Sequence, residues 1–160
     1  MERIVVFLKK YRTQTAWVVL TLLAGGVGAL LSGGFDIYKT INKPPLSPPA
    51  VVFPIVWTLL YIMMGLSSGT VAVSRDLDKP SALKLYLLHL LINILWPVIF
   101  FRFYAFKLAC VWLALLIFTL LIVFRRFLGI EKKSAWLLLP YFAWSLFALY
   151  LNFGVVALNS

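Results

Sequence analysis

Five apolar stretches without a formal charge divide the chain, and clusters of charged residues separate them. They cover residues 13–35, 44–74, 85–101, 108–124 and part of 134–160. A helix needs about 20 apolar residues to cross the hydrocarbon core of a bilayer. Each stretch is that long or nearly so, the second after its proline-rich start is excluded. The pattern predicts an all-α fold, an integral membrane bundle of five transmembrane helices.

The composition supports a membrane protein of one domain. The chain has 160 residues, of which 63% are hydrophobic, and its mean hydropathy is +0.99. These values are typical of a polytopic membrane protein and argue against a soluble core. Only residues 102–107 separate the third and fourth stretches, which should therefore form a tight antiparallel hairpin. Without a linker or an internal repeat, we expect residues 1–160 to form a single domain.

The charges orient the predicted bundle. The net charge is +10, but the basic residues lie in short clusters between the apolar stretches, so we expect anionic lipid headgroups, and no nucleic acid, as their partners. Eleven basic residues fall on the side of the N-terminus and four on the other side. Because basic residues stay preferentially in the cytoplasm, we predict a cytoplasmic N-terminus and an outside C-terminus in a bacterial plasma membrane.

The connection between the first and second stretches is rich in proline. Five of the eight prolines fall between Pro44 and Pro54. Proline fixes φ and lacks an N–H, so Pro44 to Pro49 should be stiff, extended backbone, whereas Pro54 is tolerated in the first turns of a helix. A connection this long and stiff could close one end of the bundle. The alternative is a plain membrane helix with a stiff start and interfacial aromatic residues.

Three of the predicted helices carry polar or aromatic residues at helical spacing, on one face each. The second has Trp57, Tyr61, Met64 and Ser68; the third has His89, Asn93, Trp96 and Phe100; the fifth has Tyr141, Trp144, Ala148 and Asn152. Polar groups are costly against lipid, so these faces should point inward. Together they could line a cavity for a flat, mostly apolar ligand. The alternative is that the amides pair between helices and the tryptophans form an interfacial belt.

Few residues are suited to catalysis or metal binding. His89 is the only histidine, and we interpret it as an interfacial hydrogen-bonding residue, with axial ligation of a metalloporphyrin as the alternative. Cys110 is alone, and the acidic residues lie at or beyond the predicted helix ends. We therefore expect no metal site and no hydrolytic centre. Gly65 and Gly69 form a GxxxG pattern, which favours close helix packing first and a dimer interface second.

Three strings of residues carry a family resemblance. Lys43 to Tyr61 reads K-P-x-x-x-P-P-x-x-V-F-P-x-V-W-T-x-x-Y, which resembles the signature of the TspO/MBR family. Leu91 to Phe101 resembles the third-helix string L-x-N-x-x-W-x-x-x-F-F of that family, and the fifth-helix string P-Y-x-A-W-x-x-F-A-x-x-L-N is similar to residues 140–152. The chain departs from the family at Val51 and Ile37, where tryptophan is usual or frequent.

The resemblance implies a five-helix bundle, often dimeric, with a ligand pocket at one end covered by the first loop. Ligands of the family are protoporphyrin IX and related tetrapyrroles, benzodiazepine-type drugs and, in animal members, cholesterol. The cholesterol motif requires a basic residue that the tail after Tyr150 lacks. No cofactor is obligatory, and porphyrin is a ligand. Matched by position, the implied ligand-binding residues are Tyr38, Pro48, Trp57, Tyr61, Asn93, Trp96, Phe100, Trp144 and Ala148.

Four hypotheses follow for the function. The first is an integral membrane receptor or sensor that binds porphyrins and benzodiazepine-type aromatic ligands within the bundle. The second is a transporter of tetrapyrroles or lipids. The third is a light-dependent porphyrin-degrading enzyme, since Trp57 and Trp144 match tryptophans linked to that reaction in bacterial members of the family. The fourth is a purely structural protein without a ligand.

Overall fold

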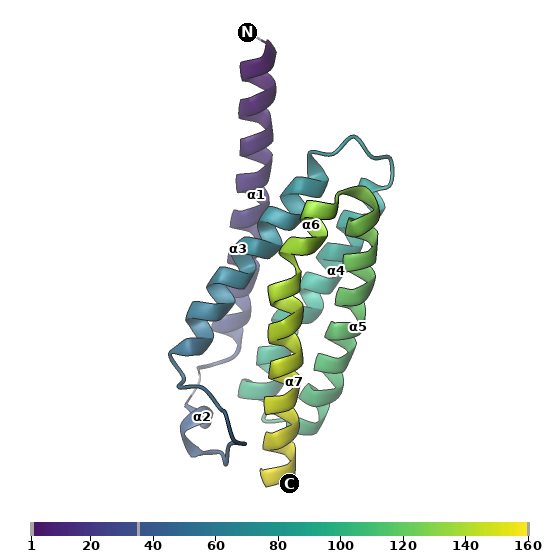
Figure 1. Cartoon of the computed structure of the whole chain (residues 1–160). Helices are drawn as coiled ribbons and strands as arrows, with labels where there is room; N and C mark the ends of the chain where they lie inside the picture. The colour runs from purple at the N-terminus through teal and green to yellow at the C-terminus, as the bar shows by residue number, and fades with distance from the viewer. Residues whose placement is uncertain (1, 35, 160) are drawn as a thin grey trace.

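A computed structural model describes residues 2–34 and 36–159 of the chain, with side-chain detail from Tyr11 onward. It is a bundle of helices without a strand among these residues (Figure 1). The elements in chain order are α1 (Glu2–Leu31), α2 (Ile37–Thr40), α3 (Val52–Ala72), α4 (Lys79–Pro97), the π-helical turn η1 (Val98–Arg102), α5 (Phe106–Ile130), α6 (Lys132–Leu137) and α7 (Leu139–Asn159).

Among the described residues, five ranges are long and apolar enough to cross a membrane, as predicted. They are Tyr11–Leu31, Val52–Ala72, Lys79–Arg102, Phe106–Ile130 and Lys132–Asn159. Several predicted boundaries are wrong, and one of them is the start of the third helix, since α4 begins at Lys79 instead of Leu85. α1 begins at Glu2 instead of residue 13, and α5 continues past Arg125 to Ile130. Charge marks where a helix leaves the hydrocarbon, but it does not end the helix, because Lys and Arg are good helix formers. α1 ends at Leu31, so its predicted end at Phe35 is also wrong. The predicted end at Ser160 lies outside the described residues.

Two prolines interrupt the predicted helices. Pro97 ends α4 and leads into the wide turn η1, and the last predicted helix is divided at Leu138 into α6 and α7, two residues before Pro140. A proline has no N–H to donate to the carbonyl four residues earlier, so the regular ladder is broken there. In η1 the wider turn buries both Phe100 and Phe101. Both residues consequently face the interior.

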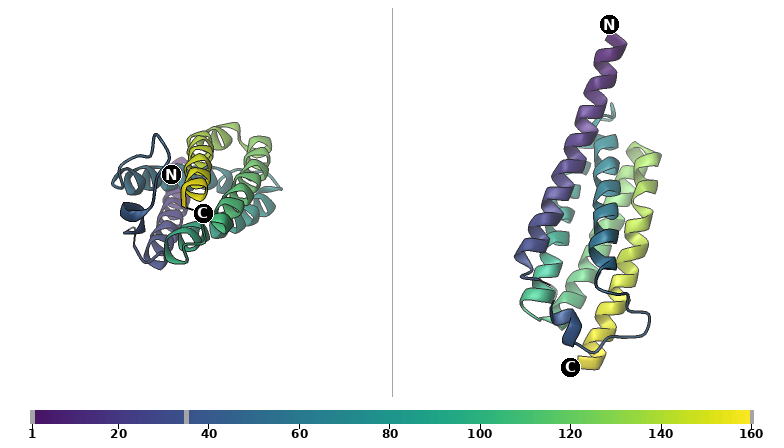
Figure 2. Two further views of the ribbon diagram at one scale, coloured as in Figure 1. Left: turned by 90° about the horizontal axis from the view of Figure 1, so that it is seen from below. Right: turned by 90° about the vertical axis from the view of Figure 1, so that its left-hand side faces the viewer.

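The helices alternate in direction, which places the termini at opposite ends of the bundle (Figure 1). α1 packs along α3 and α4, α5 packs between α4 and α7, and the short α6 packs against α3 and α5. α1 extends beyond the other helices at the N-terminal end (Figure 2). α2, the proline-rich loop, η1 and the C-terminal end of α7 all lie at the other end. The predicted antiparallel hairpin of α4 and α5 is confirmed.

Polar and apolar side chains are distributed as expected for a protein surrounded by lipid. Large apolar side chains such as Leu30, Val111 and Phe153 are more than 60% exposed on the outside. Buried polar side chains lie inside the bundle: Thr21, Ser32, Ser67, Ser68, His89, Asn93, Thr119, Ser134, Ser145 and Asn152. Because hydrocarbon offers no hydrogen-bond partner, this arrangement is stable in a membrane. The protein is therefore an integral membrane protein.

The GxxxG pattern on α3 brings α1 and α3 into backbone contact. A Cβ atom at Gly65 would lie 2.5 Å from the Cα of Val18, and one at Gly69 would lie 2.8 Å from the Cα of Gln14. Such distances leave no room for a methyl group, so the glycines serve helix packing, the first of the two predicted roles. At Gly129 on α5, by contrast, a Cβ would meet nothing within 4 Å.

This difference predicts opposite effects of alanine at two helical glycines. Gly65→Ala must push α1 away from α3 and should destabilise the protein by about 1–3 kcal/mol. Gly129→Ala should be neutral or stabilise it by about 0.5–1 kcal/mol, because alanine is the better helix former. Thermal unfolding in detergent measures both. Equal melting temperatures for the two variants would contradict the close packing of α1 and α3.

Candidate ligand-binding site

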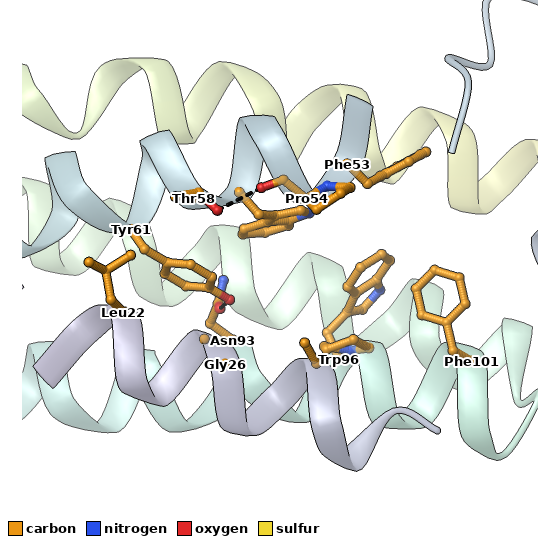
Figure 3. Close-up of a pocket in the computed structure, with 13 residues that line it drawn as sticks. Leu22, Gly26, Phe53, Pro54, Thr58, Tyr61, Asn93, Trp96 and Phe101 are labelled. Atoms are coloured by element: carbon orange, nitrogen blue, oxygen red, sulfur yellow. Dashed lines mark hydrogen bonds between the residues drawn. The ribbon is translucent and has the colours of Figure 1, made fainter. Parts of the chain in front are cut away.

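A cavity of about 230 Å³ lies between α1, α3 and the end of α4. Its walls carry Trp57 and Tyr61 from α3 and Asn93 and Trp96 from α4, four residues of the predicted inward faces (Figure 3). The remaining lining residues are Leu22, Gly25, Gly26, Ala29, Phe53, Pro54, Thr58, Pro97 and Phe101. We call it the main cavity. The polar and aromatic stripes of α3 and α4 therefore meet at one hollow.

The main cavity has an opening on the outside of the bundle. Gly26 and Ala29 of α1 and Pro54 and Thr58 of α3 line it and are exposed on the surface of the described structure. A Cβ atom at Gly26 would meet nothing within 4 Å. These residues lie within ranges that can span a membrane. The mouth of the main cavity therefore faces the hydrocarbon between α1 and α3.

A small cavity of about 30 Å³ lies beside it, under the proline-rich loop. It is lined by Tyr38, Ser47, Phe53, Trp96, Phe100, Phe101, Ala148, Leu151, Asn152 and Val155. Phe53, Trp96 and Phe101 belong to the walls of both cavities. A movement of these three rings would join the two cavities into one.

Seven of the nine sequence-predicted site residues line one of the two cavities. The main cavity has Trp57, Tyr61, Asn93 and Trp96; the small cavity has Tyr38, Trp96, Phe100 and Ala148. Pro48 and Trp144 line neither. The Pro48 carbonyl accepts a hydrogen bond from the Tyr38 hydroxyl at 2.8 Å. The Trp144 ring packs against Phe53, with the ring centroids 6.1 Å apart, so it lies behind a ring shared by the two cavities.

Several lining residues were not predicted from the sequence. Phe53 lies four residues before Trp57 on α3, so extending the stripe by one turn would have identified it. Asn152 had been assigned to an inward face but not to the site. The contribution of α1 could not be predicted, because it consists of glycine and alanine: the side chain of Tyr61 occupies the space that a Cβ atom at Gly25 would need.

A chain of hydrogen bonds connects the main cavity to the centre of the bundle. The Tyr61 hydroxyl donates to Oδ1 of Asn93 at 2.7 Å, and Nδ2 of Asn93 donates to the Tyr141 hydroxyl at 2.8 Å. The Tyr141 oxygen lies 2.9 Å from Nε2 of His89, whose Nδ1 lies 2.8 Å from Oγ1 of Thr119. We call these five residues the polar chain. It joins α3, α4, α5 and α7.

The interpretation of His89 as an interfacial residue is wrong. The side chain is 1% exposed and lies in the interior of the bundle. Burial is possible because both ring nitrogens have hydrogen-bond partners there. Since both nitrogens have partners, neither is free to ligate a metalloporphyrin. Among the residues with described side chains, no three His, Cys, Asp or Glu residues come together as a metal site.

Other polar groups near the small cavity have no partner among the described residues. They are Nε1 of Trp96, Nε1 of Trp144 and both amide atoms of Asn152. Asn152 is only 1% exposed. A buried polar group without a hydrogen bond costs about 1–3 kcal/mol. The end of the bundle beneath the loop is thus less well satisfied than its centre.

Residues 42–50, which we call the lid, cross this end of the bundle and are fixed to α7. The amide N–H of Asn42 donates to Oδ1 of Asn159 at 2.9 Å, and Nδ2 of Asn159 donates to the Asn42 carbonyl at 2.8 Å. The Tyr150 hydroxyl donates to the Pro45 carbonyl at 2.9 Å. The buried ring of Pro44 occupies the space beside Gly154 that a Cβ atom would need.

The lid is also held at its α2 side, by Tyr38. The Lys43 ammonium donates to the Tyr38 carbonyl at 3.0 Å and lies 4.7 Å from the centre of the Tyr38 ring. Burial raises the pKa of the Tyr38 phenol above its ordinary value. The hydroxyl therefore stays protonated and can donate to Pro48 at any physiological pH.

The prediction of extended backbone from Pro44 to Pro49 is wrong in part, because the lid contains a turn. Pro45 is followed by Leu46 at φ +66°, and the chain turns at these two residues. Proline in the second position and a positive φ in the third are features of a type II turn, which usually has glycine at the third position. The prolines therefore stiffen a folded loop. Val51 follows the lid and is 64% exposed, and Ile37 packs against the core.

Comparison with known proteins places the site in a family context. The sequence profile of the TspO/MBR family matches residues 16–158. The "Tryptophan-rich sensory protein" of Cereibacter sphaeroides is 34% identical over 135 residues, which are 82% of each chain. The "Tryptophan-rich protein TspO" of Chlorobaculum tepidum is 33% identical over 76% of this chain and 78% of its own. The "Translocator protein" of Bos taurus is 31% identical over 86% and 84%.

The contacts of Asn159 predict that one substitution loosens the lid. Asn159→Ala removes both hydrogen bonds to the backbone of Asn42 and should raise the hydrogen-exchange rate of residues 42–50 about tenfold. Exchange measured by mass spectrometry in detergent tests this. Leu158→Ala, at an exposed neighbouring side chain, is the matched control. Unchanged exchange in the Asn159 variant would show that these bonds do not hold the lid.

Proposed function

The chain belongs to the TspO/MBR family of integral membrane proteins, and on this premise we propose that it is a receptor for flat aromatic ligands. The ligands are porphyrin-type tetrapyrroles, with protoporphyrin IX as the reference compound, and molecules of the benzodiazepine class. They bind inside the bundle, beneath the lid. The names of the relatives, which include a "sensory" and a "translocator" protein, fit a ligand-binding role.

The unpaired amide of Asn152 is the observation that carries the proposal. This side chain is 1% exposed, lines the small cavity and has no hydrogen-bond partner at either amide atom among the described residues. A ligand with both N–H groups and acceptor nitrogens would supply the missing partners. A free-base tetrapyrrole has both at the centre of its ring, where an amide above the ring plane can reach them. Trp96, whose N–H group is also unpaired, lines the same cavity, and the unpaired N–H group of Trp144 belongs to a ring that packs against the lining residue Phe53.

The walls of the two cavities suit a planar apolar guest. Phe53, Trp57, Trp96 and Phe101 offer ring faces and edges, on which aromatic ligands stack or pack with about 0.5–1.5 kcal/mol per ring pair beyond the area that is buried. Trp57 itself lies between Tyr61, Trp96 and Tyr141, at centroid distances of 5.6, 6.4 and 6.1 Å. The lining rings therefore come mainly from α3, α4 and η1, and Tyr141 of α7 supports Trp57 from behind.

The size of the cavities implies that a macrocycle binds with a change of shape. Sites for drug-sized ligands have volumes of about 300–1,000 Å³, whereas the main cavity has about 230 Å³ and the small one about 30 Å³. A bicyclic aromatic molecule fits the main cavity as it is. A tetrapyrrole requires that Phe53, Trp96 and Phe101 move and that the lid shifts, so its association should be slow.

The lid end of the bundle is basic, which suits the acidic edge of such a ligand. Protoporphyrin IX carries two propionates on one edge of its apolar ring system. Lys39, Lys43, Arg102 and Lys107 lie at this end of the bundle, and Arg102 is exposed beside the end of α1, where it donates to the Leu31 carbonyl at 3.3 Å. We expect the propionates to face these side chains while the rings enter the interior.

A receptor is favoured over an ion-coupled transporter by the position of the acidic residues. Asp36, Asp76, Asp78 and Glu131 are in the connections between the spanning ranges, and Glu2 precedes the first range. Proton or sodium coupling in transporters usually depends on a carboxylate within the membrane. The breaks at Pro97 and Leu138 lie near helix ends. The spanning ranges of the described structure contain no Asp or Glu.

We further propose that the lid faces the outside of a bacterial plasma membrane and that the N-terminus is cytoplasmic. Eleven basic residues belong to the N-terminal end of the bundle and four to the lid end. The positive-inside rule then orients the bundle.

Ligand binding should quench the intrinsic tryptophan fluorescence in a saturable manner. Titration with protoporphyrin IX in detergent measures the affinity. The double variant Trp57→Phe with Trp144→Phe should bind about tenfold more weakly, because it loses the indole of Trp57 in the wall and the indole of Trp144 that supports Phe53. Trp136→Phe is the control, since Trp136 on α6 is 61% exposed and lines neither cavity. Absence of saturable quenching, or an unchanged affinity of the double variant, would refute the site.

The proposed orientation predicts which cysteines a membrane-impermeant maleimide can reach in intact cells. In a Cys110→Ala background, Lys39→Cys should be labelled on α2, whereas Leu77→Cys should react only after permeabilisation. Both native side chains are well exposed, with 74% of the Lys39 side chain and 96% of Leu77 accessible. If Leu77→Cys is labelled in intact cells and Lys39→Cys is protected, the protein has the opposite orientation and the proposal is refuted.

A further inference from the structure

The polar chain ends at a group that can only accept hydrogen bonds. Thr119 on α5 has its Oγ1 2.9 Å from the carbonyl oxygen of Leu116, one turn earlier in the same helix. A carbonyl has no proton, so the hydroxyl proton of Thr119 points to Leu116. Toward His89, the Thr119 oxygen can therefore only accept.

This end fixes the tautomer of His89. Because Thr119 accepts, Nδ1 of His89 must carry the proton, and Nε2 of the neutral imidazole is then an acceptor. The Tyr141 hydroxyl lies 2.9 Å from Nε2 and donates its proton to it. The Tyr141 oxygen is thereby left to accept from the Asn93 amide, as the arrangement of the Asn93 side chain requires.

The direction continues to the wall of the main cavity. With Nδ2 of Asn93 turned to Tyr141, its Oδ1 faces Tyr61 and accepts the proton of that phenol at 2.7 Å. Figure 3 shows Tyr61 of α3 and Asn93 of α4 facing each other beside the cavity. All bonds of the polar chain point the same way, from Tyr61 to Leu116. The Tyr61 proton is used inside the protein, and its oxygen keeps a lone pair for a ligand.

We propose that Thr119 is a specificity-determining residue of the main cavity, although it does not line it. By fixing the direction of the polar chain, it makes the Tyr61 end of the cavity a hydrogen-bond acceptor. The cavity then selects aromatic ligands that bring an N–H or O–H donor over those that bring only an acceptor. This inference rests on the proposed function, because it specifies the ligand class of the same site, and it adds a chemical requirement to the flat shape.

Removal of the Thr119 oxygen should abolish this selection. In Thr119→Val, a protonated Nδ1 of His89 would be a buried N–H without an acceptor, which is rare in proteins. The proton moves to Nε2 and donates to the Tyr141 oxygen, the Tyr141 hydroxyl turns to Asn93, and the Asn93 amide reverses. Its N–H then donates to the Tyr61 oxygen, and the Tyr61 proton becomes available to the ligand. Thr119→Ser retains the hydroxyl and should retain the original direction.

Two bicyclic probes of similar size separate the two states. Indole offers an N–H donor, and quinoline offers an acceptor nitrogen without a donor. The dissociation constants of both probes are measured by calorimetry in detergent, and their ratio is calculated for each variant. Partition of the probes into micelles is the same for all variants, so it cancels when these ratios are compared. Wild type and Thr119→Ser should prefer indole about three- to tenfold, the value of one hydrogen bond. Thr119→Val should lose or reverse this preference. Tyr61→Phe should keep it, because Oδ1 of Asn93 loses its donor and remains an acceptor in the cavity wall.

The outcomes distinguish this inference from the proposed function. Failure of protoporphyrin IX to bind the wild type refutes the receptor proposal, whatever the ratio of the small probes. If the indole preference is absent in the wild type, or if it persists unchanged in Thr119→Val, the role of Thr119 is refuted even when protoporphyrin IX binds. A merely structural effect of the valine would lower the melting temperature and weaken both probes together, leaving the ratio unchanged, which also contradicts the inference.

Discussion

Hydrocarbon offers no hydrogen-bond partner, and the hydrogen bonds of Asn93 meet that constraint at the centre of the bundle. Its amide links Tyr61 of α3 to Tyr141 of α7, and through Tyr141 and His89 the chain reaches α5. Interhelical hydrogen bonds in membrane proteins contribute about 0.6–2 kcal/mol each. That is modest, so packing supplies the rest. The polar chain also fixes the positions of the helices along the bundle axis, because all four helices must be correctly aligned for every hydrogen bond to form.

The two ends of the bundle differ in packing and in how many buried polar groups lack a partner. Among the described residues, Ser74 Oγ lacks one near the N-terminal end, and atoms of Trp96, Trp144 and Asn152 lack one toward the lid. Toward the N-terminal end, Ser67 of α3 and Ser134 of α6 each donate to the other's backbone carbonyl at 2.8 Å, and the glycines of α3 bring the backbone of α1 into contact. Toward the lid, the bundle contains the main cavity, the small cavity and the unpaired amide of Asn152. One end is thus a rigid scaffold, and the other can rearrange around a guest, as binding sites on stable frameworks commonly do.

The spans and most of the site could be predicted because they depend on local patterns. Apolar stretches gave the five spans, and helical spacing gave the inward faces that bring Trp57, Tyr61 and Asn93 together. The position of His89 could not be predicted, since its burial depends on Thr119 and Tyr141, which come from other helices. Nor could the turn at Leu46, where the contacts of the lid with α7 hold a residue other than glycine at positive φ. Both features depend on contacts between helices that are distant in the sequence, and local sequence patterns do not predict such contacts.

The mouth of the main cavity, between Gly26, Ala29, Pro54 and Thr58, has a consequence for how affinity is defined. A molecule that passes this mouth leaves the acyl chains of the bilayer, and its activity there is set by its partition coefficient. Two compounds with equal contacts in the cavity would differ in aqueous potency by the ratio of their partition coefficients. The amount of lipid or detergent in a preparation then acts as a reservoir that shifts every titration, and occupancy follows the mole fraction of ligand in the membrane.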